Sequence, residues 1–186
     1  MVLCIILIAN TIRIRVKHGE KSGLVREVFS EVSETYDLFN DVASLGFHRI
    51  WKKYALWLLN LKSGETLLDV ASGSGDLAIK ATELVKPAGT VVMCDINDRM
   101  LEHGRNRCLD QGRLIPLVKA DAESLPFMDD SFDKLTIGFG LRNITDKTRA
   151  LKEFKRVLRP GGKALILEFS QMSEGNPIKK VYDWYS

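Results

Sequence analysis

Apolar and polar positions follow a helical spacing in the first third of the chain. From about Glu20 to Asp37, apolar side chains recur every four positions, which predicts a helix. Turn formers in "YDLFND" (36–41) break this pattern. The stretch "HRIWKKYALWLLNL" then predicts a second helix that ends near Asn60. Both helices precede the first clear strand, so we expect them to form an N-terminal helical extension outside the central sheet.

From Glu65 onward, short apolar runs alternate with helical patterns. The predicted strands are "TLLDV", "GTVVMCDI", "LIPLVKAD", "FDKLTIGFG" and "GGKALILEF", and the predicted helices are "DLAIKATELV", "DRMLEHGRNRCL" and "KTRALKEFKRVLRP". Continuous apolar strands separated by helices indicate a parallel sheet covered on both faces. The predicted fold class is therefore α/β, with a doubly wound, mostly parallel sheet. Ligands bind at the carboxyl ends of such strands, so the loops after Asp69, Asp95, Asp121 and Gly138 matter most.

The first ten residues, "MVLCIILIAN", are apolar but do not fit a targeting segment. They are too few to span a bilayer, and they lack the basic start of a signal peptide. The stretch could form an extra strand, make a weak membrane contact or reflect an unnatural start of the reading frame. The last two interpretations are favoured over a working signal.

Composition narrows the class of protein without naming a function. The chain has 186 residues, 45% of them hydrophobic and 27% charged, which suits one soluble globular domain. Its formal net charge of +3 is too small to argue for nucleic acid. The three cysteines lack metal spacing and the three histidines are scattered, so a reduced compartment and no metal are expected.

The loop in "LLDVASGSGDLAIK" carries the first chemical signal. Gly73, Gly75 and Ala78 match the dinucleotide fingerprint G-x-G-x-x-A, and the glycines let backbone approach a ligand closely. A bare tight turn is the alternative. Asp76 opens the following helix and occupies the field that would attract a phosphate. With Asp69 nearby, the pocket is predicted to suit a ligand with a cationic end and no phosphate.

S-adenosylmethionine is such a ligand, since it carries a sulfonium, an ammonium and a ribose. Asp95, at the end of the second strand, can accept hydrogen bonds from both ribose hydroxyls. Asp121, after the third strand, can accept from the adenine amino group, while Ala122 offers a backbone N–H to the ring. Each aspartate alone could equally be a cap or a surface residue. Asp69, Asp95 and Asp121 end three successive strands, and this pattern makes the alternative much weaker.

Several segments together resemble the ubiquinone/menaquinone biosynthesis C-methyltransferases, which methylate a ring carbon of polyprenyl quinols. The segments are "VFSEVSETYDLFNDVASLGFHRIWKK", "LLDVASGSGDLA", "DINDRML", "DAESLPF", "GFGLRNITDKTRALKEFKRVLRPGGKALILEFS" and "YDWYS". The resemblance implies a Rossmann-like class I methyltransferase domain. It assigns S-adenosylmethionine contacts to Ser74, Asp95, Asp121, Ala122 and Gly138. Ser74 stands where the family usually has threonine, Gly138 replaces a usual serine, and Ser72 occupies a glycine position.

The resemblance also sets the expected domain boundaries. Residues 1–16 are atypical, residues 17–62 are expected to form a helical lid, and residues 63–186 are expected to form the S-adenosylmethionine-binding domain. The family's chain continues past Ser186 through further helices and two more strands, so this domain is expected to be incomplete. We therefore expect the last predicted strand to be an apolar edge, and methyl transfer by this chain to be weak or absent.

The implied reaction suggests catalytic candidates. A quinol hydroxyl must lose its proton before the ring carbon attacks the methyl group. Arg142 follows the fourth strand, and its guanidinium could stabilise the phenolate; a structural salt bridge is the alternative. Asn143 could orient the substrate or hold a water. In the lid, Asp41 or His48 could act as the base, although capping or packing would also explain them.

The favoured function is S-adenosylmethionine-dependent C-methylation of a polyprenyl benzoquinol or naphthoquinol. The prenyl tail implies transient contact with a membrane surface, in the cytoplasm at the inner membrane or on the mitochondrial matrix side. A homodimer or a quinone-biosynthesis complex is possible on this reading, and nucleic acid is not expected. The alternatives are a non-catalytic S-adenosylmethionine-binding subunit, or a methyltransferase acting on another small molecule, an amine or a nucleic acid. Asp76 and the lack of a second nucleotide-binding half disfavour a dehydrogenase.

Overall fold

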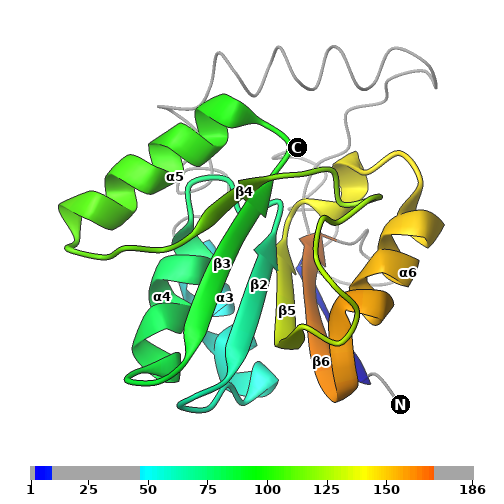
Figure 1. Ribbon diagram of the computed structural model, residues 1–186, viewed down its shortest axis with the longest axis horizontal. Coiled ribbons are helices and arrows are strands. Elements are labelled where there is room, and N and C mark those ends of the chain that lie inside the picture. The colour runs from blue at the N-terminus through cyan, green and yellow to red at the C-terminus, as the bar shows by residue number, and fades with distance from the viewer. Residues whose placement is uncertain (1–2, 10–46, 170–186) are drawn as a thin grey trace, which may run out of the picture.

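The computed structural model describes residues 3–9 and 47–169, and this part of the chain forms a six-stranded parallel sheet (Figure 1). The strand order is β1-β6-β5-β2-β3-β4. The strands are β1 (Leu3–Ala9), β2 (Thr66–Val70), β3 (Thr90–Asp95), β4 (Leu117–Lys119), β5 (Phe132–Gly138) and β6 (Leu158–Phe169). The helices are α3 (Phe47–Leu59), α4 (Asp76–Val85), α5 (Asp98–Asp110) and α6 (Lys147–Val157), with a 3-10 turn η1 (Leu141–Asn143).

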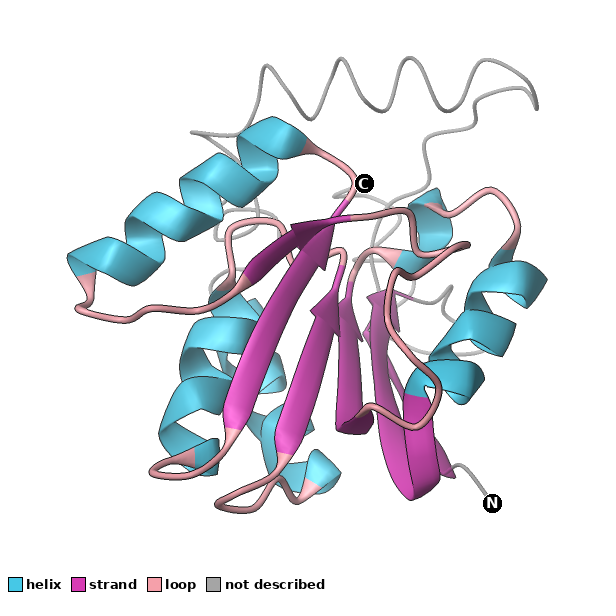
Figure 2. Cartoon of the chain, viewed as in Figure 1, coloured by secondary structure: helices cyan, strands magenta, loops and turns pink. Residues whose placement is uncertain are grey.

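This architecture confirms the predicted doubly wound α/β fold. Strand β2 and helix α4 have the predicted bounds, and each later strand alternates with a helix or a connecting loop (Figure 2). Strand β4 is shorter than predicted. Pro116 precedes it and has no N–H to donate to the ladder, although its carbonyl accepts the Met93 N–H at 2.8 Å.

Two hydrophobic clusters form the core, one on each face of the sheet. Side chains alternate along the strands, so Leu67 belongs to the cluster under α3, α4 and α5, whereas Leu68 belongs to the cluster under α6. Asp69 shares the face of Leu67, and its register partner on β5 is Thr136. The helices cover the two faces of the sheet, so the loops form the surface at the carboxyl ends of the strands.

The N-terminal stretch is an edge strand of the sheet, which corrects the expectation that β6 is the edge. Strand β1 pairs in parallel with β6 from Leu3 opposite Lys163 to Ala9 opposite Phe169. Residues 3–9 thus form the extra strand that the sequence offered as one interpretation. Strand β6 is not an exposed edge, because β1 and β5 flank it. Its backbone groups are paired on both sides.

Helix α3 lies outside the sheet, as expected, and packs into the core on one of its faces. Ala55 and Leu59 are fully buried in the cluster that also contains Leu165 of β6. The helix lies against β6 and α4. The predicted helix over residues 20–37, the turn at 36–41 and Asp41 lie outside the described residues. Within the described ranges, no helix is both long and apolar enough to cross a bilayer.

Candidate functional site

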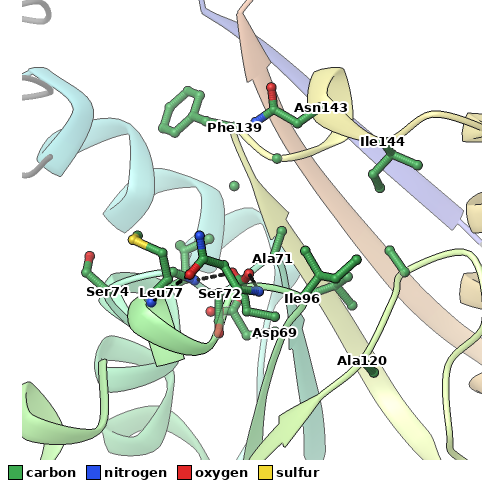
Figure 3. A pocket seen from close by; sticks show the side chains of 18 of the residues that line it. Asp69, Ala71, Ser72, Ser74, Leu77, Ile96, Ala120, Phe139, Asn143 and Ile144 are labelled. Atoms are coloured by element: carbon green, nitrogen blue, oxygen red, sulfur yellow. Dashed lines mark hydrogen bonds between the residues drawn. The ribbon is translucent and has the colours of Figure 1, made fainter. Parts of the chain in front are cut away.

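A cavity of about 270 Å³ opens at the carboxyl edge of the sheet. Its walls come from the loops after β2, β3, β4 and β5, together with Lys52 of α3. Figure 3 shows Ser74 and Leu77 at one side of this cavity and Ala120 and Ile144 at the other. Loops that are distant in sequence meet here because parallel strands end at a common edge.

The loop after β2 adopts left-handed backbone at three positions. Ala71 has φ 49°, Gly73 has φ 52°, and Gly75, which caps the start of α4, has φ 79°. The conformation at Ala71 is costly for a residue with a side chain. Helix α5 packs directly on this loop: a Cβ on Gly104 would lie 2.7 Å from the Gly73 carbonyl oxygen. The loop is therefore held rigidly against α5.

Asp95 fixes the same loop from the end of β3. Its Oδ2 accepts the Gly73 N–H at 2.9 Å, and its Oδ1 accepts the Asn97 N–H at 2.9 Å. The carboxyl is 91% buried, and burial raises its pKa against the lowering effect of these backbone donors. Each carboxylate oxygen has further acceptor capacity. Asp95 lines the cavity, so the oxygens that order the loop can also accept from ligand hydroxyls.

Asp69 is buried at the bottom of the site, at the end of β2. Its Oδ1 accepts a hydrogen bond of 2.6 Å from the Thr136 hydroxyl. Burial raises the pKa of Asp69 to about 7, although the Thr136 hydrogen bond and the charge of Lys52 act in the opposite direction. The carboxyl lines the cavity. A cationic ligand group would favour its ionised form.

Asp76 has a different role from the one expected, because cations surround it. Lys52 Nζ donates to its Oδ2 at 2.7 Å, Arg107 Nη2 donates to its Oδ1 at 2.8 Å, and Lys80 lies 3.9 Å away. Burial would raise the pKa of Asp76, but Lys52, Lys80 and Arg107 outweigh it and hold that pKa far below its usual value. Asp76 ties α3, α4 and α5 together, and its charge is compensated. Asp76 therefore does not present the uncompensated negative charge that was expected to repel a phosphate.

The loop after β4 brings Asp121 and Ala122 to the opposite wall. Asp121 is exposed, and its Oδ1 accepts the Glu123 N–H at 2.9 Å. Ala122 is buried, and both residues line the cavity. Both residues therefore lie at the cavity wall, and their contacts with a flat heterocycle stay a prediction.

The loop after β5 carries Gly138, Asn143 and Arg142, which occupy different places. Gly138 and Asn143 line the cavity, whereas Arg142 does not. Arg142 pairs with Glu168 of β6: its Nη1 lies 3.2 Å from Oε1, and its backbone N–H donates to Oε2 at 3.0 Å. Phe139, before these residues, has φ 58°. The salt bridge named as the alternative for Arg142 is thus present.

The structure brings most of the predicted cofactor residues together. The members that line the cavity are Asp69, Gly73, Ser74, Asp95, Asp121, Ala122 and Gly138. Gly75 does not line it; a Cβ there would lie 2.8 Å from Met93 Cε behind the loop. His48 lies in α3, but its side chain is outside the described residues, as is Asp41.

Sequence reasoning missed Lys52 and Ser72 as lining residues. Lys52 is 8% exposed and lies one turn before Ala55 and Leu56 on the apolar face of α3. A lysine within an apolar stripe was the signal that could have found it. The buried Oγ of Ser72 has no hydrogen-bond partner within the described part of the chain.

Comparison with known proteins gives the family. The family model described as "ubiE/COQ5 methyltransferase family" matches residues 15–186. The chain belongs to this family. It is 48% identical over 171 residues to "Ubiquinone/menaquinone biosynthesis C-methyltransferase UbiE" of Bordetella avium, covering 92% of this chain and 66% of that one. It is 51% identical over 170 residues to the protein of the same name from Hahella chejuensis, covering 90% and 68%.

The chain therefore spans about two thirds of the length of these ubiE/COQ5 relatives. Among solved structures, a SAM dependent methyltransferase from Aquifex aeolicus has a TM-score of 0.61 at 24% identity, covering 72% of this chain and 73% of that one. This likeness supports the fold. The resemblance on which the sequence analysis relied is confirmed, and strand β1 lies outside the residues that the ubiE/COQ5 model matches.

The residues of the cavity fit S-adenosylmethionine, the cofactor that the family implies. Asp69 can meet a cation, Asp95 has acceptor capacity for hydroxyls, and Ser72 Oγ is a buried polar atom that lacks a partner. Within the described residues no cluster of side chains could hold a metal. Burial raises the pKa of Cys94 to about 12, so little of the reactive thiolate forms at neutral pH.

Proposed function

We propose that this protein transfers a methyl group from S-adenosylmethionine to a ring carbon of a polyprenyl benzoquinol or naphthoquinol. The carrying observation is a single cavity that unites Asp69, Asp95, Asp121 and Asn143 in a chain of the ubiE/COQ5 methyltransferase family. The names of the relatives describe enzymes of ubiquinone and menaquinone biosynthesis. Bound S-adenosylmethionine supplies an electrophilic methyl group on its sulfonium.

The cofactor roles follow the order of the strands. Asp95 accepts hydrogen bonds from the ribose hydroxyls while it holds the Gly73 N–H. Asp121 accepts from the adenine amino group, and the Ala122 N–H donates to the ring. Asp69 faces the ammonium end. Because these groups are held in place before a ligand arrives, little ordering entropy is lost on binding.

At the acceptor side, Arg142 stabilises the quinolate and Asn143 orients its oxygen. The Arg142 side chain is 40% exposed where it pairs with Glu168. A partly exposed ion pair contributes only ~0–1 kcal/mol, so the pair with Glu168 opposes a contact between the guanidinium and a phenolate only weakly. Arginine is a poor base, so the proton leaves to water, to Asp41 in the proposed lid or to His48 at the start of α3.

Membrane contact is proposed for the outer face of α3. Tyr54 and Trp57 are 49% and 69% exposed, and their rings stack with centroids 5.5 Å apart. Lys53 is exposed beside them. Aromatic rings next to a cation are typical of surfaces that meet lipid head groups. This face would give access to the prenyl tail at the inner membrane from the cytoplasm.

Methyl transfer tests the proposal directly. The chain is first extended at its C-terminus with the segment that follows the aligned region in a Pseudomonas putida relative. The extended protein is then incubated with radiolabelled S-adenosylmethionine and a short-tailed quinol. We expect label in the quinol ring. Binding of S-adenosylmethionine without any transfer would favour the non-catalytic binding subunit instead.

A further inference from the structure

Lys52 presents an incompletely used ammonium group to the cavity. Its side chain is 10% exposed, it lines the cavity, and its Nζ donates to Asp76 Oδ2 at 2.7 Å. An ammonium has three N–H donors. Within the described part of the chain, Asp76 is the one acceptor that it reaches. A buried ammonium with donors to spare is costly unless a ligand completes its hydrogen bonds.

The charges around Asp76 leave a surplus of positive charge at this wall. Lys52, Arg107 and Lys80 all lie within 4 Å of one carboxylate. Arg107 and Lys80 do not line the cavity, whereas Lys52 does. Lys52 is therefore the group through which this surplus reaches a ligand.

Asp69 supplies the opposite charge on the same face of the sheet. Lys52 is near enough to influence the ionisation of Asp69, and both residues line the cavity. A buried carboxylate and a buried ammonium on neighbouring walls are complementary to a zwitterion. The α-amino acid end of S-adenosylmethionine is such a group, with an ammonium and a carboxylate on one carbon.

We propose that Lys52 binds the carboxylate of the cofactor's amino-acid end, while Asp69 faces its ammonium. The inference rests on the proposed function, because it concerns the same ligand. Asp76 acts behind Lys52 as a positioning residue. Helix α3 thus contributes a specificity residue that distinguishes amino-acid cofactors from adenosine ligands that lack the carboxylate.

Titration calorimetry with two ligands tests this role. S-adenosylmethionine is compared with decarboxylated S-adenosylmethionine, which keeps the sulfonium, ribose and ammonium. The variants are Lys52→Met, Arg107→Met and Lys53→Met. Arg107→Met also removes a cation from Asp76, together with the donor to the Ser74 carbonyl, but it removes no side chain that lines the cavity. Lys53→Met removes an exposed charge from the same helix as Lys52.

We expect Lys52→Met to weaken S-adenosylmethionine by roughly 10- to 100-fold, the range for one hydrogen bond between charged groups, and to leave the decarboxylated ligand nearly unchanged. Arg107→Met should weaken both ligands by equal factors, and Lys53→Met neither. Equal losses for both ligands in Lys52→Met, or no loss, would overturn the inference.

The wild-type protein provides a test that does not depend on a folded variant. It should bind S-adenosylmethionine more tightly than the decarboxylated ligand. Equal affinities would overturn the role of Lys52 alone and leave the proposed function standing. Binding of neither ligand would overturn the proposed function itself.

Discussion

The loops after β2 and β5 have similar designs, but they differ in how firmly their charges are held. Each begins at a non-glycine residue in left-handed backbone, Ala71 at φ 49° and Phe139 at φ 58°. Beside each loop, a cation is paired with a carboxylate. The Lys52–Asp76 pair has side chains 10% and 14% exposed, whereas in the Arg142–Glu168 pair they are 40% and 16% exposed.

This difference separates binding from chemistry. A buried ammonium that leaves its partner loses much free energy, so Lys52 stays in place and suits a ligand that is bound the same way in every cycle. A partly exposed ion pair such as Arg142–Glu168 contributes little, so we propose that Arg142 stabilises a charge that appears only during the reaction. On the proposed function, the β2 loop would hold the cofactor and the β5 loop would respond to the acceptor.

The largest effect is expected at the loop after β5, from a change of Arg142. Arg142→Ala should lower turnover by ~10²–10³ in the extended protein and leave affinity for S-adenosylmethionine near normal. Part of the rate should return at high pH, where the quinol ionises unaided. Glu168→Gln is the matched control, because it breaks the same salt bridge and keeps the guanidinium. If both variants lose the same rate, Arg142 is structural.

On the β2 side, Asp95→Ala should weaken the binding of S-adenosylmethionine by ~1.5–3 kcal/mol. The variant loses the ribose acceptor and leaves the Gly73 N–H without its partner. Calorimetry measures the loss, and circular dichroism checks that the variant is folded. Asp98→Ala, which removes an exposed carboxylate paired with Lys119, should bind normally. Normal affinity in a folded Asp95→Ala protein would contradict the ribose role.

The ionisation of Asp69 sharpens the comparison through pH. With a pKa of about 7 in the free protein, Asp69 is mostly neutral at pH 6 and ionised at pH 8. Affinity for the cationic end should therefore rise by roughly tenfold over this range, whereas Asp69→Asn should flatten the profile. A wild-type profile that is already flat would contradict this role.

Stability should show the opposite trend for the same group. The ordinary pKa of Asp69 is 3.8, so between pH 4 and pH 7 the folded protein binds a proton that the unfolded chain has released. The contribution of Asp69 to the free energy of unfolding should therefore fall as pH rises through this window. Chemical denaturation at several pH values gives the free energy of unfolding of the wild type and of Asp69→Asn. Plotted against pH, this free energy should fall more steeply for the wild type than for Asp69→Asn. Parallel slopes would mean that Asp69 is ionised throughout.

The smallest expected effect concerns Gly138. A Cβ at this position would lie 2.8 Å from Leu77 Cδ1, the end of a flexible side chain that can rotate away. Gly138→Ser adds a hydroxyl at the cavity wall and should tighten cofactor binding by less than ~1 kcal/mol. A loss of affinity in calorimetry would show that Leu77 does not yield.

The sequence predicted the sheet and most of the cofactor site for one physical reason. Period and composition mark parallel strands, and parallel strands place their following loops at a common edge. Asp69, Asp95 and Asp121 could therefore be brought together without a structure.

What the sequence did not predict depends on contacts between distant segments. The pairing of residues 3–9 with residues 163–169 leaves no local sign in either stretch. The compensation of Asp76 by Lys52 and Arg107 joins three helices, so its isolated charge was misinterpreted. Arg142 was correctly placed on its loop, but its orientation toward Glu168 is a tertiary contact.

Calorimetric titration of the unmodified chain with S-adenosylmethionine, and separately with NAD, tests the central claim most directly. The compensated charge of Asp76 makes this comparison necessary, since repulsion of phosphate can no longer be assumed. A cavity built for S-adenosylmethionine predicts a saturable heat with about one site per chain for that ligand and none for NAD. Saturable heat with NAD and none with S-adenosylmethionine would contradict it.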